Sequence, residues 1–506
     1  MKFLELLEGV ELAGFGVHCQ NAGNPEITGI AYDSRRVGPG SLFVAMRGET
    51  SDGNRFVDQA IGAGAVAVVT DSDLATTGVA WARVAHGRQA LATLSANFYG
   101  QPANQLGITG ITGTNGKSTT AFLIEAILGA AGRGGALVGT IEYHIGKKVL
   151  PAPHTTPESL DLQRLFCETV ASGGSEVVME VSSHALAQGR THGIFFDVAV
   201  FTNLTRDHLD YHKSMEEYFQ AKKILFAGSG RPAPRTAVLN ADDSYGANLA
   251  AFARGQGSQV STYGWSKADF HARDVAMTAR GTQFRLICPQ GSIKISSPLI
   301  GRVNVYNILA ASAAALGRGC SLESVAQGVR TLKAVPGRFE RVDCGQPFTV
   351  VVDYAHTDDA LRNLTSLAGE FVKQNSGRVI TVFGCGGDRD RSKRPLMGEA
   401  AGQGSDFVVL TSDNPRSEDP LAIINDAVIG LQRSGARYRT EPNRRAAIAL
   451  AIGEARAGDI VLIAGKGHEK VQITPAGAIP FDDREVAADV LRKLGYENPS
   501  NQEGTA

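Results

Sequence analysis

The sequence GITGTNGKS at residues 110–118 decides how this chain is built. It follows a short apolar segment, residues 106–111, and opens a run, residues 118–130, whose apolar positions have helical spacing. A strand, a glycine-rich turn and a helix start form a cradle for phosphate, because backbone N–H groups point at anionic oxygens and the helix dipole adds positive potential. The sequence therefore predicts a nucleoside triphosphate site.

The turn departs from the strict GxxxxGK[ST] pattern, because Ile111 stands where the first glycine is expected. Gly113 and Gly116 carry the turn instead. Lys117 supplies a full positive charge, and the Ser118 hydroxyl is a candidate ligand for Mg²⁺. We expect this segment to contact ATP through Gly113, Thr114, Asn115, Gly116, Lys117, Ser118 and Thr119.

Composition narrows the class of protein. The length of 506 residues predicts about three domains, and a net charge of −1 argues against a nucleic-acid partner, which needs a basic face. Glu5, Glu8 and Glu11 interrupt any signal-peptide core, and no apolar run approaches the length of a membrane span, so we expect a cytoplasmic protein without membrane insertion. The six cysteines form no CxxC pair, which indicates reduced thiols.

The chain divides into three predicted α/β blocks. They cover residues 1–103, 104–336 and 337–496, followed by a tail, 497–506, that we expect to be disordered. Residues 101–104 are the expected first linker and 335–338 the expected hinge before the third block. The predicted strands are 27–32, 41–45, 65–70, 106–111, 176–181, 198–202, 236–240, 348–353, 379–383, 407–411 and 460–464. The clearest predicted helices are 88–99, 421–431 and 444–455. Ligands of such open sheets bind beyond the carboxyl ends of the strands.

Polar clusters follow several of these strands. Residues 180–184 (EVSSH) and 203–212 (NLTRDHLDYH) collect oxygen donors and imidazoles, which suit a nucleotide that arrives with Mg²⁺. Helix capping by Ser182 or Asp207 is the simpler alternative for each residue taken alone. Asn304 and Asn307 are spaced as neighbours on one helix face and could bond an adenine or a metal-bound water, although Asn304 could also be an N-cap.

Residues 112–117, 180–184, 207–210 and 301–307 together resemble the motifs of the Mur ligase family, in the same order and at similar separations. The resemblance extends from about residue 25 to residue 485. It implies an N-terminal nucleotide-sugar-binding α/β domain, a central P-loop ATPase-like domain with a mostly parallel sheet, and a C-terminal Rossmann-like domain. It also implies an ATP-dependent amide ligase of peptidoglycan precursor synthesis, and thereby a part in cell-wall biogenesis, cell shape and cell division.

Family members activate a substrate carboxylate as an acyl phosphate, which an amine then attacks. By resemblance, Lys117 and Ser118 hold the β,γ-phosphates and one Mg²⁺, while Glu180 and His208 help to place a second. Lys222 matches the family lysine that is carbamoylated to N6-carboxylysine, which turns a repelling ammonium into an anionic metal ligand. Arg338 and His356 match residues that reach the ATP when the third block closes over the second.

The resemblance also implies both substrates. The residues matching contacts to UDP-N-acetylmuramoyl-L-alanyl-D-glutamate are Ser34, Thr155, Thr156, Ser182, Gln188 and Arg190. The residues matching contacts to meso-diaminopimelate are Arg389, Asp413, Asn414, Pro415, Arg416, Gly465 and Glu469. Arg416 favours diaminopimelate over lysine, because diaminopimelate is lysine with an extra carboxylate that a guanidinium grips with two hydrogen bonds. Glu469 is expected to pair with the distal ammonium.

Other readings remain open at this stage. Residues 413–416 contain an Asn-Pro pair that is a turn signal in its own right. A lysine-adding ligase and a folylpolyglutamate synthase share the reaction type, and a nucleotide-gated switch would show slow ATP turnover indifferent to any amine. His154 and Asp358 stand where family relatives often carry Asn and Pro. The expected partners are small molecules alone, and we expect a monomer.

Overall fold

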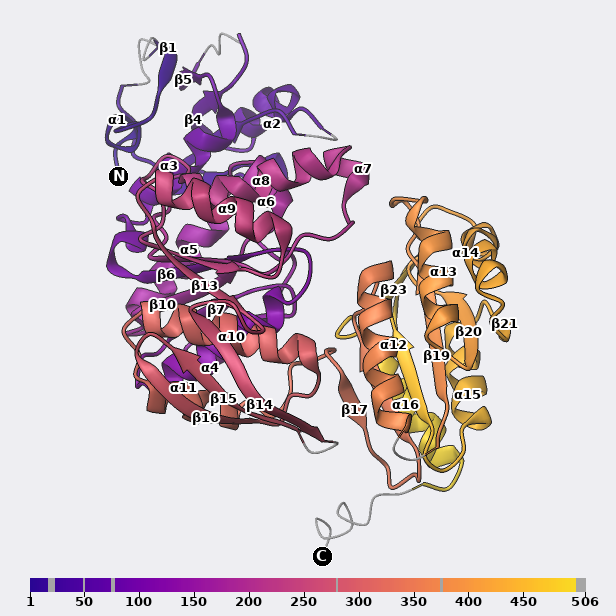
Figure 1. Ribbon diagram of the computed structural model, residues 1–506. Coiled ribbons are helices and arrows are strands. Elements are labelled where there is room, and N and C mark those ends of the chain that lie inside the picture. Colours follow the sequence, from indigo (N-terminus) through magenta and orange to yellow (C-terminus); the bar gives the residue numbers. More distant parts are fainter. Residues whose placement is uncertain (17–22, 49–50, 74–77, 279–280, 374–375, 497–506) are drawn as a thin grey trace, which may run out of the picture.

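The structure, a computed structural model, describes residues 1–16, 23–48, 51–73, 78–278, 281–373 and 376–496. Three sheets, each built from one stretch of the chain, account for most of it (Figure 1). Every predicted strand is found, with ends within two residues of those predicted. The α/β class and the mostly parallel central sheet are therefore confirmed. The predicted disordered tail and Cys19 lie outside the described residues.

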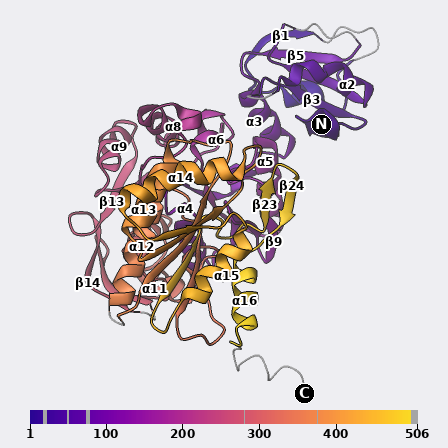
Figure 2. The ribbon, with the colours of Figure 1, turned by 90° about the vertical axis from the view of Figure 1, so that its right-hand side faces the viewer.

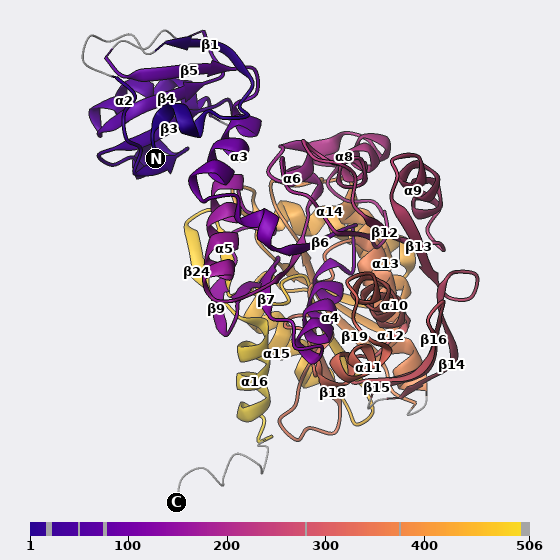
Figure 3. The same ribbon diagram turned by 90° about the vertical axis from the view of Figure 1, so that its left-hand side faces the viewer.

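The first sheet has the strand order β1-β5-β4-β3-β2, with β2 to β5 parallel and β1 antiparallel to β5. Its elements are α1 (Phe3–Leu6), β1 (Leu12–Gly16), β2 (Gly29–Ala31), η1 (Ser34–Arg36), β3 (Ser41–Ala45), η2 (Gly53–Phe56), α2 (Val57–Gly62), β4 (Ala65–Thr70), β5 (Ala80–Val84) and α3 (Gly87–Phe98). Figures 2 and 3 show that this block is separate from the rest of the molecule and contacts it along α3.

The middle sheet has eleven strands in the order β16-β15-β14-β13-β12-β11-β6-β10-β7-β8-β9. Its strands are β6 (Gly107–Thr112), β7 (Gly135–Val138), β8 (Glu142–Ile145), β9 (Lys148–Pro151), β10 (Glu176–Glu180), β11 (Val198–Phe201), β12 (Thr236–Asn240), β13 (Gln259–Gly264), β14 (Phe270–Thr278), β15 (Gly281–Cys288) and β16 (Gly291–Ser297). Its helices are η3 (Pro102–Gln105), α4 (Lys117–Ala130), α5 (Ser159–Ala171), α6 (Ser183–Ala187), α7 (Leu209–His212), α8 (Met215–Ala227), α9 (Ser244–Gly255), α10 (Arg302–Gly317) and α11 (Leu322–Thr331).

The two faces of this sheet are buried by different helices. One apolar core packs α4, α10 and α11 against the sheet, and a second packs α5, α8 and α9 against the opposite face. Parallel strands covered on both faces are apolar throughout, which is why the sequence predicted them as continuous apolar runs. The sequence did not predict β8, β9 and β14 to β16, which pair antiparallel at the two ends of the sheet with one face partly exposed.

The third sheet has the order β17-β18-β22-β19-β20-β21, with only β17 antiparallel. Its elements are β17 (Glu340–Val342), β18 (Thr349–Asp353), α12 (Asp358–Lys373), β19 (Val379–Cys385), α13 (Lys393–Gln403), β20 (Phe407–Ser412), α14 (Pro420–Ser434), β21 (Tyr438–Thr440), α15 (Arg444–Glu454), β22 (Ile460–Ala464) and α16 (Asp483–Lys493). A hairpin of β23 (Val471–Thr474) and β24 (Gly477–Pro480), also not predicted, stands beside it.

Helices α12, α13 and α14 cover one face of the third sheet, and α15 and α16 cover the other. Among the described residues, no helix is both long and apolar enough to span a bilayer. The five cysteines that the structure describes are all free thiols.

Candidate active site

The phosphate-binding turn, residues 113–116, joins β6 to α4. Gly113 has φ +148°, and a Cβ there would lie 1.8 Å from the Thr202 hydroxyl oxygen. Gly116 has φ +88°, and a Cβ there would lie 2.5 Å from Asn307 Oδ1. Both positions require glycine, because neither the backbone conformation nor the space admits a side chain. The turn therefore brings its backbone close to any bound anion.

The loop after β11, residues 202–208, holds this turn in place, and we call it the anchoring loop. The backbone N–H groups of Thr114 and Asn115 donate to the carbonyl and side-chain oxygens of Asn203, each at 2.9 Å. The Thr205 N–H donates to the Thr114 hydroxyl at 3.0 Å. The Thr202 hydroxyl donates to the Asn115 carbonyl at 2.6 Å. The turn is thus rigid before any ligand arrives.

Two predicted site lysines meet at this turn. Lys117 Nζ donates to the carbonyls of Gly113 and Thr114 at 2.9 Å each, and Lys222 Nζ, from α8, donates to the Gly113 carbonyl at 3.0 Å. Lys222 is 1% exposed and its ammonium lies 4.4 Å from the centre of the Tyr218 ring. Burial, helped by the charge of Lys117, lowers the pKa of Lys222 well below its usual value. A larger share of this amine is therefore neutral than for a surface lysine.

Glu180 ends β10 with its carboxylate fixed by the turn after β7. The Thr140 backbone N–H donates to Glu180 Oε1 at 2.8 Å, and the Thr140 hydroxyl donates to Oε2 at 3.0 Å. Gly139 leaves room for this carboxylate, since a Cβ there would lie 2.5 Å from Oε1. The Thr140 hydroxyl oxygen also lies 3.1 Å from that of Thr155. A single threonine thus joins a predicted metal ligand to a predicted sugar-binding residue.

His208 lies at the end of the anchoring loop with φ +55°. Its ring packs edge-on against His184 and Tyr218, with centroid distances of 4.9 and 5.9 Å. Burial lowers the pKa of His208 to about 3, and the positive charge of Lys222 acts in the same direction. The imidazole is therefore neutral near pH 7 and has a nitrogen lone pair available.

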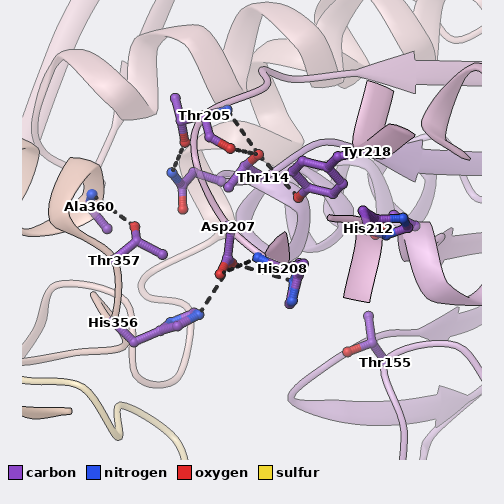
Figure 4. A network of polar contacts seen from close by, with 12 residues as sticks. Thr114, Thr155, Thr205, Asp207, His208, His212, Tyr218, His356, Thr357 and Ala360 are labelled. Carbon is purple, nitrogen blue, oxygen red and sulfur yellow. Dashed lines mark hydrogen bonds and ion pairs between the residues drawn. The ribbon is translucent and has the colours of Figure 1, made fainter. Parts of the chain in front are cut away.

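Asp207, next to His208, joins the middle and third blocks. One of its carboxylate oxygens lies 3.4 Å from His208 Nε2 and 3.8 Å from His356 Nε2 (Figure 4). The other lies 3.7 Å from Lys393 Nζ. Burial would raise the pKa of Asp207, but His208, His356 and Lys393 hold it well below its usual range. Asp207 is therefore a buried carboxylate that is ionised at neutral pH.

A cavity of about 320 Å³ opens beside the turn, between the middle and third blocks. Eight of the predicted ATP residues line it, namely Asn115, Gly116, Ser118, Thr119, Asn304, Asn307, Arg338 and His356. Asn304 is inside α10, with Gly301 as the N-cap, so the capping alternative is wrong. Arg338 donates to the Ser118 hydroxyl at 3.3 Å, and its guanidinium lies 4.6 Å from the centre of the Tyr354 ring. The hinge arginine therefore reaches the phosphate side of the cavity.

The predicted nucleotide-sugar residues of the middle block form one network. The Thr156 hydroxyl donates to the Glu180 carbonyl and accepts from the Ser182 N–H, while Arg190 donates to the carbonyl of Thr156 and the side-chain oxygen of Gln188. Ser182 is also the N-cap of α6, so it has the structural role considered above as well. Ser34 lies in the first block, where its hydroxyl donates to Gln59.

Glu158 links the first block to this network. One oxygen of its carboxylate lies 2.7 Å from Arg88 Nη1, in α3, and 3.1 Å from Arg190 Nε. The Tyr32 hydroxyl adds a second link by donating to Asp161, in α5, at 2.9 Å. The first block is thus attached to the middle block through the residues around Arg190.

The predicted diaminopimelate residues lie at the carboxyl ends of three adjacent parallel strands, β19, β20 and β22. Arg416 donates to the Gly387 carbonyl at 2.8 Å. A Cβ on Gly386 would lie 3.1 Å from Arg416 Nη1 and 3.7 Å from Arg389 Cγ, so the two arginines flank this glycine. Burial lowers the pKa of Arg416, and the neighbouring charge of Arg389 adds to the effect. Two arginine side chains that meet at this glycine favour an anionic ligand there.

Glu469 already has a cationic partner in this chain. Lys466 Nζ, fully buried, donates to Glu469 Oε2 at 2.9 Å and to Asn414 Oδ1 at 3.0 Å, and Asn414 Nδ2 donates to Glu469 Oε2 at 2.8 Å. A Cβ on Gly465 would lie 2.5 Å from Asp413 Oδ2. These loops therefore hold one another, and a ligand ammonium would share Glu469 with Lys466.

Sequence reasoning missed several residues that the structure brings to the site. Asp359 accepts from the Asn115 side chain at 3.0 Å, Asp353 and Tyr354 line the cavity, and Asp207, Lys393 and Lys466 make the ion pairs above. Of these, Asp207 stood within a motif that the sequence did single out. Asp359 and Lys393 carry no local signal, because their partners, Asn115 and Asp207, lie in the middle block. Asp353 and Tyr354 lie close in the chain to the predicted residue His356, and Lys466 lies next to Gly465.

The arrangement of these side chains suits the binding of anionic ligands. The turn, Lys117 and Arg338 present donors and positive charge to a polyphosphate, with the carboxylate of Glu180 and the hydroxyl of Ser118 beside it. The carboxyl end of the third sheet presents Arg389 and Arg416, which suit a small molecule that carries a carboxylate. Two anionic ligands can thus be held on opposite sides of the gap between the blocks.

Comparison with known proteins gives matches along most of the chain. Residues 26–99 match the family model "Mur ligase family, catalytic domain", residues 111–315 the "Mur ligase middle domain", and residues 337–467 the "Mur ligase, glutamate ligase domain". A curated relative from Solibacter usitatus is 56% identical over 476 residues, which are 93% of this chain and 94% of the relative. A relative from Geobacillus kaustophilus is 48% identical over 98% of this chain and its own full length. Both are named UDP-N-acetylmuramoyl-L-alanyl-D-glutamate–2,6-diaminopimelate ligase.

A solved structure with the same name is similar to this fold. It has a TM-score of 0.68 and 34% sequence identity, and the match covers 98% of this chain and 99% of that chain. A structure of MurF from Acinetobacter baumannii, at 19% identity and a TM-score of 0.65, shares the fold over 97% of this chain. The three-block architecture is thus common to proteins of differing sequence.

Proposed function

Since the chain belongs to the Mur ligase family, we propose that it is an ATP-dependent amide ligase that adds meso-diaminopimelate to UDP-N-acetylmuramoyl-L-alanyl-D-glutamate. The observation that carries this proposal is the 56% identity over 93% of the chain to a ligase of that name. The reaction belongs to cytoplasmic peptidoglycan precursor synthesis, and through it to cell shape and division. We propose that the chain works as a cytoplasmic monomer.

The first half of the reaction makes the substrate carboxylate reactive. A carboxylate oxygen of the D-glutamyl residue attacks the γ-phosphorus of ATP, ADP leaves, and an acyl phosphate remains. In this chain the turn, Lys117 and Arg338 would bind the phosphates, and Asn304 and Asn307 would line the adenosine side of the cavity. Arg190, at the Thr156 network, would hold a carboxylate of the nucleotide sugar. Fixing two anions beside each other supplies the proximity that the reaction needs.

The residues near the turn fit the Mg²⁺ that the family implies. Ser118 and Glu180 offer the hard oxygen donors that Mg²⁺ prefers, and each Glu180 oxygen accepts one hydrogen bond and keeps a lone pair. The neutral ring of His208 can also ligate. Lys222, buried and with a lowered pKa, is suited to carbamoylation, because the neutral amine is the form that adds CO₂. When bound, Mg²⁺ would neutralise phosphate and carboxylate charge.

The second half forms the amide. The diaminopimelate amine attacks the acyl carbon, and phosphate leaves with the carboxylate oxygen. Arg389 and Arg416 would bind the distal carboxylate, Asp413, Asn414, Pro415 and Gly465 would shape the pocket, and Glu469 would face the distal ammonium. Lysine lacks that carboxylate and would leave its ammonium near two guanidinium groups, which is why the lysine-adding reaction is the less favoured alternative.

A screen of amino acids with the purified enzyme tests the proposal. With ATP and the dipeptide-bearing nucleotide sugar present, meso-diaminopimelate should give a product of the expected mass and lysine little. A product with lysine at a higher kcat/KM would make the lysine-adding alternative correct. Phosphate release indifferent to every amine would instead support a nucleotide-gated switch. Isotope tracing should find one oxygen of the substrate carboxylate in the released phosphate, and its absence would rule out the acyl phosphate.

A further inference from the structure

The anchoring loop contacts the third block through two charged side chains whose roles are not explained by the proposed chemistry. Arg206 Nη2 lies 3.4 Å from Asp390 Oδ2, and it also donates to the Ser392 hydroxyl. Asp207, the next residue, pairs with Lys393. Three polar contacts thus fall on Asp390, Ser392 and Lys393, at the start of α13.

Arg389, one of the two arginines that flank Gly386, directly precedes these residues in the chain. On its other side the segment is held by the loop after β20. The Gly387 N–H donates to the Asn414 carbonyl at 2.9 Å, the Asp388 N–H donates to Glu418 at 2.6 Å, and the Ser417 hydroxyl donates to Asp388 at 2.7 Å. Residues 386–393 therefore lie between the loop that carries Arg416 and the loop that holds the phosphate-binding turn.

The anchoring loop is a rigid support for this contact. Asn203 and Thr205 bond directly to Thr114 and Asn115 of the turn, and Arg206 follows Thr205 in the chain. Arg206 and Asp207 thus directly follow the residues that bond to the turn. The arrangement connects a phosphate site in one block with a guanidinium pocket in another.

We propose that Arg206 is a positioning residue. Through Asp390, it fixes the position of Arg389 relative to the phosphate-binding turn. The amine bound at Arg389 is thereby directed at the activated carboxylate. Asp207, through Lys393, supports the same segment. The inference rests on the proposed function, because it assumes an amine bound at Arg389 and Arg416.

A charge exchange tests the pair. The variants Arg206→Glu and Asp390→Arg each place like charges together, and the double variant restores an opposite-charge pair with its direction reversed. We expect each single variant to raise the KM for meso-diaminopimelate about tenfold and to leave the KM for ATP within about twofold. The double variant should recover most of the loss. Unchanged KM for diaminopimelate in both single variants, or additive losses in the double variant, would overturn the proposal.

The control is Arg235→Glu, which breaks an ion pair with Asp197 of similar length, 3.5 Å, on a part of the middle block that does not line the cavity. It should leave every kinetic constant unchanged. Positional exchange of the β,γ-bridging oxygen of ATP, measured with the nucleotide sugar and without any amine, should persist in all variants, which separates amine positioning from loss of activation. If the wild-type enzyme itself fails to use diaminopimelate, the proposed function is wrong, and that outcome is distinct from wild-type turnover unaffected by the variants.

Discussion

Lys117 and Lys222 direct their ammonium groups at the same carbonyl oxygen, that of Gly113, at 2.9 and 3.0 Å. Two buried ammonium groups on one acceptor repel each other, and part of that cost is relieved when one of them loses its charge or changes sign. Negative charge from a bound polyphosphate, or from a carbamate on Lys222, would offset the repulsion between these two ammonium groups. Loss of the Lys222 charge, as in the carbamoylation proposed above, would relieve this repulsion.

Replacement of Lys222 by Ala should abolish turnover, because the anionic ligand expected at this position would be lost. Short carboxylates such as acetate or formate should restore part of the activity by occupying the space that the side chain leaves. The measurement is phosphate release with and without the added acid. Lys223→Ala is the matched control, since that ammonium lies over the Phe252 ring, away from the turn. A fully active Lys222→Ala enzyme would exclude the metal role.

Replacement of Arg416 by Ala should remove the use of meso-diaminopimelate while ATP binding persists. Loss of a two-hydrogen-bond contact to a carboxylate corresponds to roughly 3 kcal/mol, or about a hundredfold in kcat/KM. Steady-state kinetics with varied diaminopimelate, together with nucleotide binding by calorimetry, would measure both effects. Arg445→Ala is the control, because Arg445 is half-exposed and pairs with Asp489, on the face of the third sheet that α15 and α16 cover. Unchanged diaminopimelate kinetics would remove Arg416 from the site.

Replacement of Gly113 by Ala should prevent formation of the phosphate-binding turn, since the new Cβ would lie 1.8 Å from the Thr202 hydroxyl at a φ of +148°. We expect loss of nucleotide binding and a destabilisation of about 1–3 kcal/mol. Gly129→Ala, within α4 and with no atom within 4 Å of the new Cβ, should instead stabilise by about 0.5–1 kcal/mol. Normal ATP affinity in Gly113→Ala would show that the turn adapts.

His144 predicts a pH dependence of stability. Burial would lower its pKa, but hydrogen bonds and charge from Glu125 and Glu142 raise it from 6.5 to about 9. The folded state therefore binds the His144 proton more tightly than the unfolded state does. The stability that this proton contributes is fully present below pH 6.5 and is lost as the pH rises to 9. The unfolding midpoint of wild type should exceed that of His144→Gln at pH 6, and the difference should shrink by pH 9.5.

The control for this measurement is His271→Gln, in β14, where the histidine ring bonds a carbonyl, that of Ala268. Its difference from wild type should not follow the same pH course. A His144→Gln difference that is constant between pH 6 and 9.5 would contradict the proposed pair.

The sequence was most informative where structure is determined locally. The turn at residues 113–116 and most of the parallel strands could be predicted, because glycine placement and continuous apolar runs act within a few residues. The parallel strands β5, β7, β13 and β21 were not predicted. The antiparallel strands β14 to β16 were missed, since each has one partly exposed face and no such run. Pairs such as Asp207 with Lys393, or Arg206 with Asp390, could not be predicted, because they join residues that only the packing of two blocks brings together.

The carboxylate of Glu158, shared by Arg88 and Arg190, limits how the enzyme could be recombined with its relatives. A chimera that imports a foreign first block without an arginine at position 88 would leave Glu158 to neutralise Arg190 alone. The guanidinium proposed to grip the nucleotide sugar would then be occupied by its own chain. Grafts should therefore exchange α3 and Glu158 as a unit.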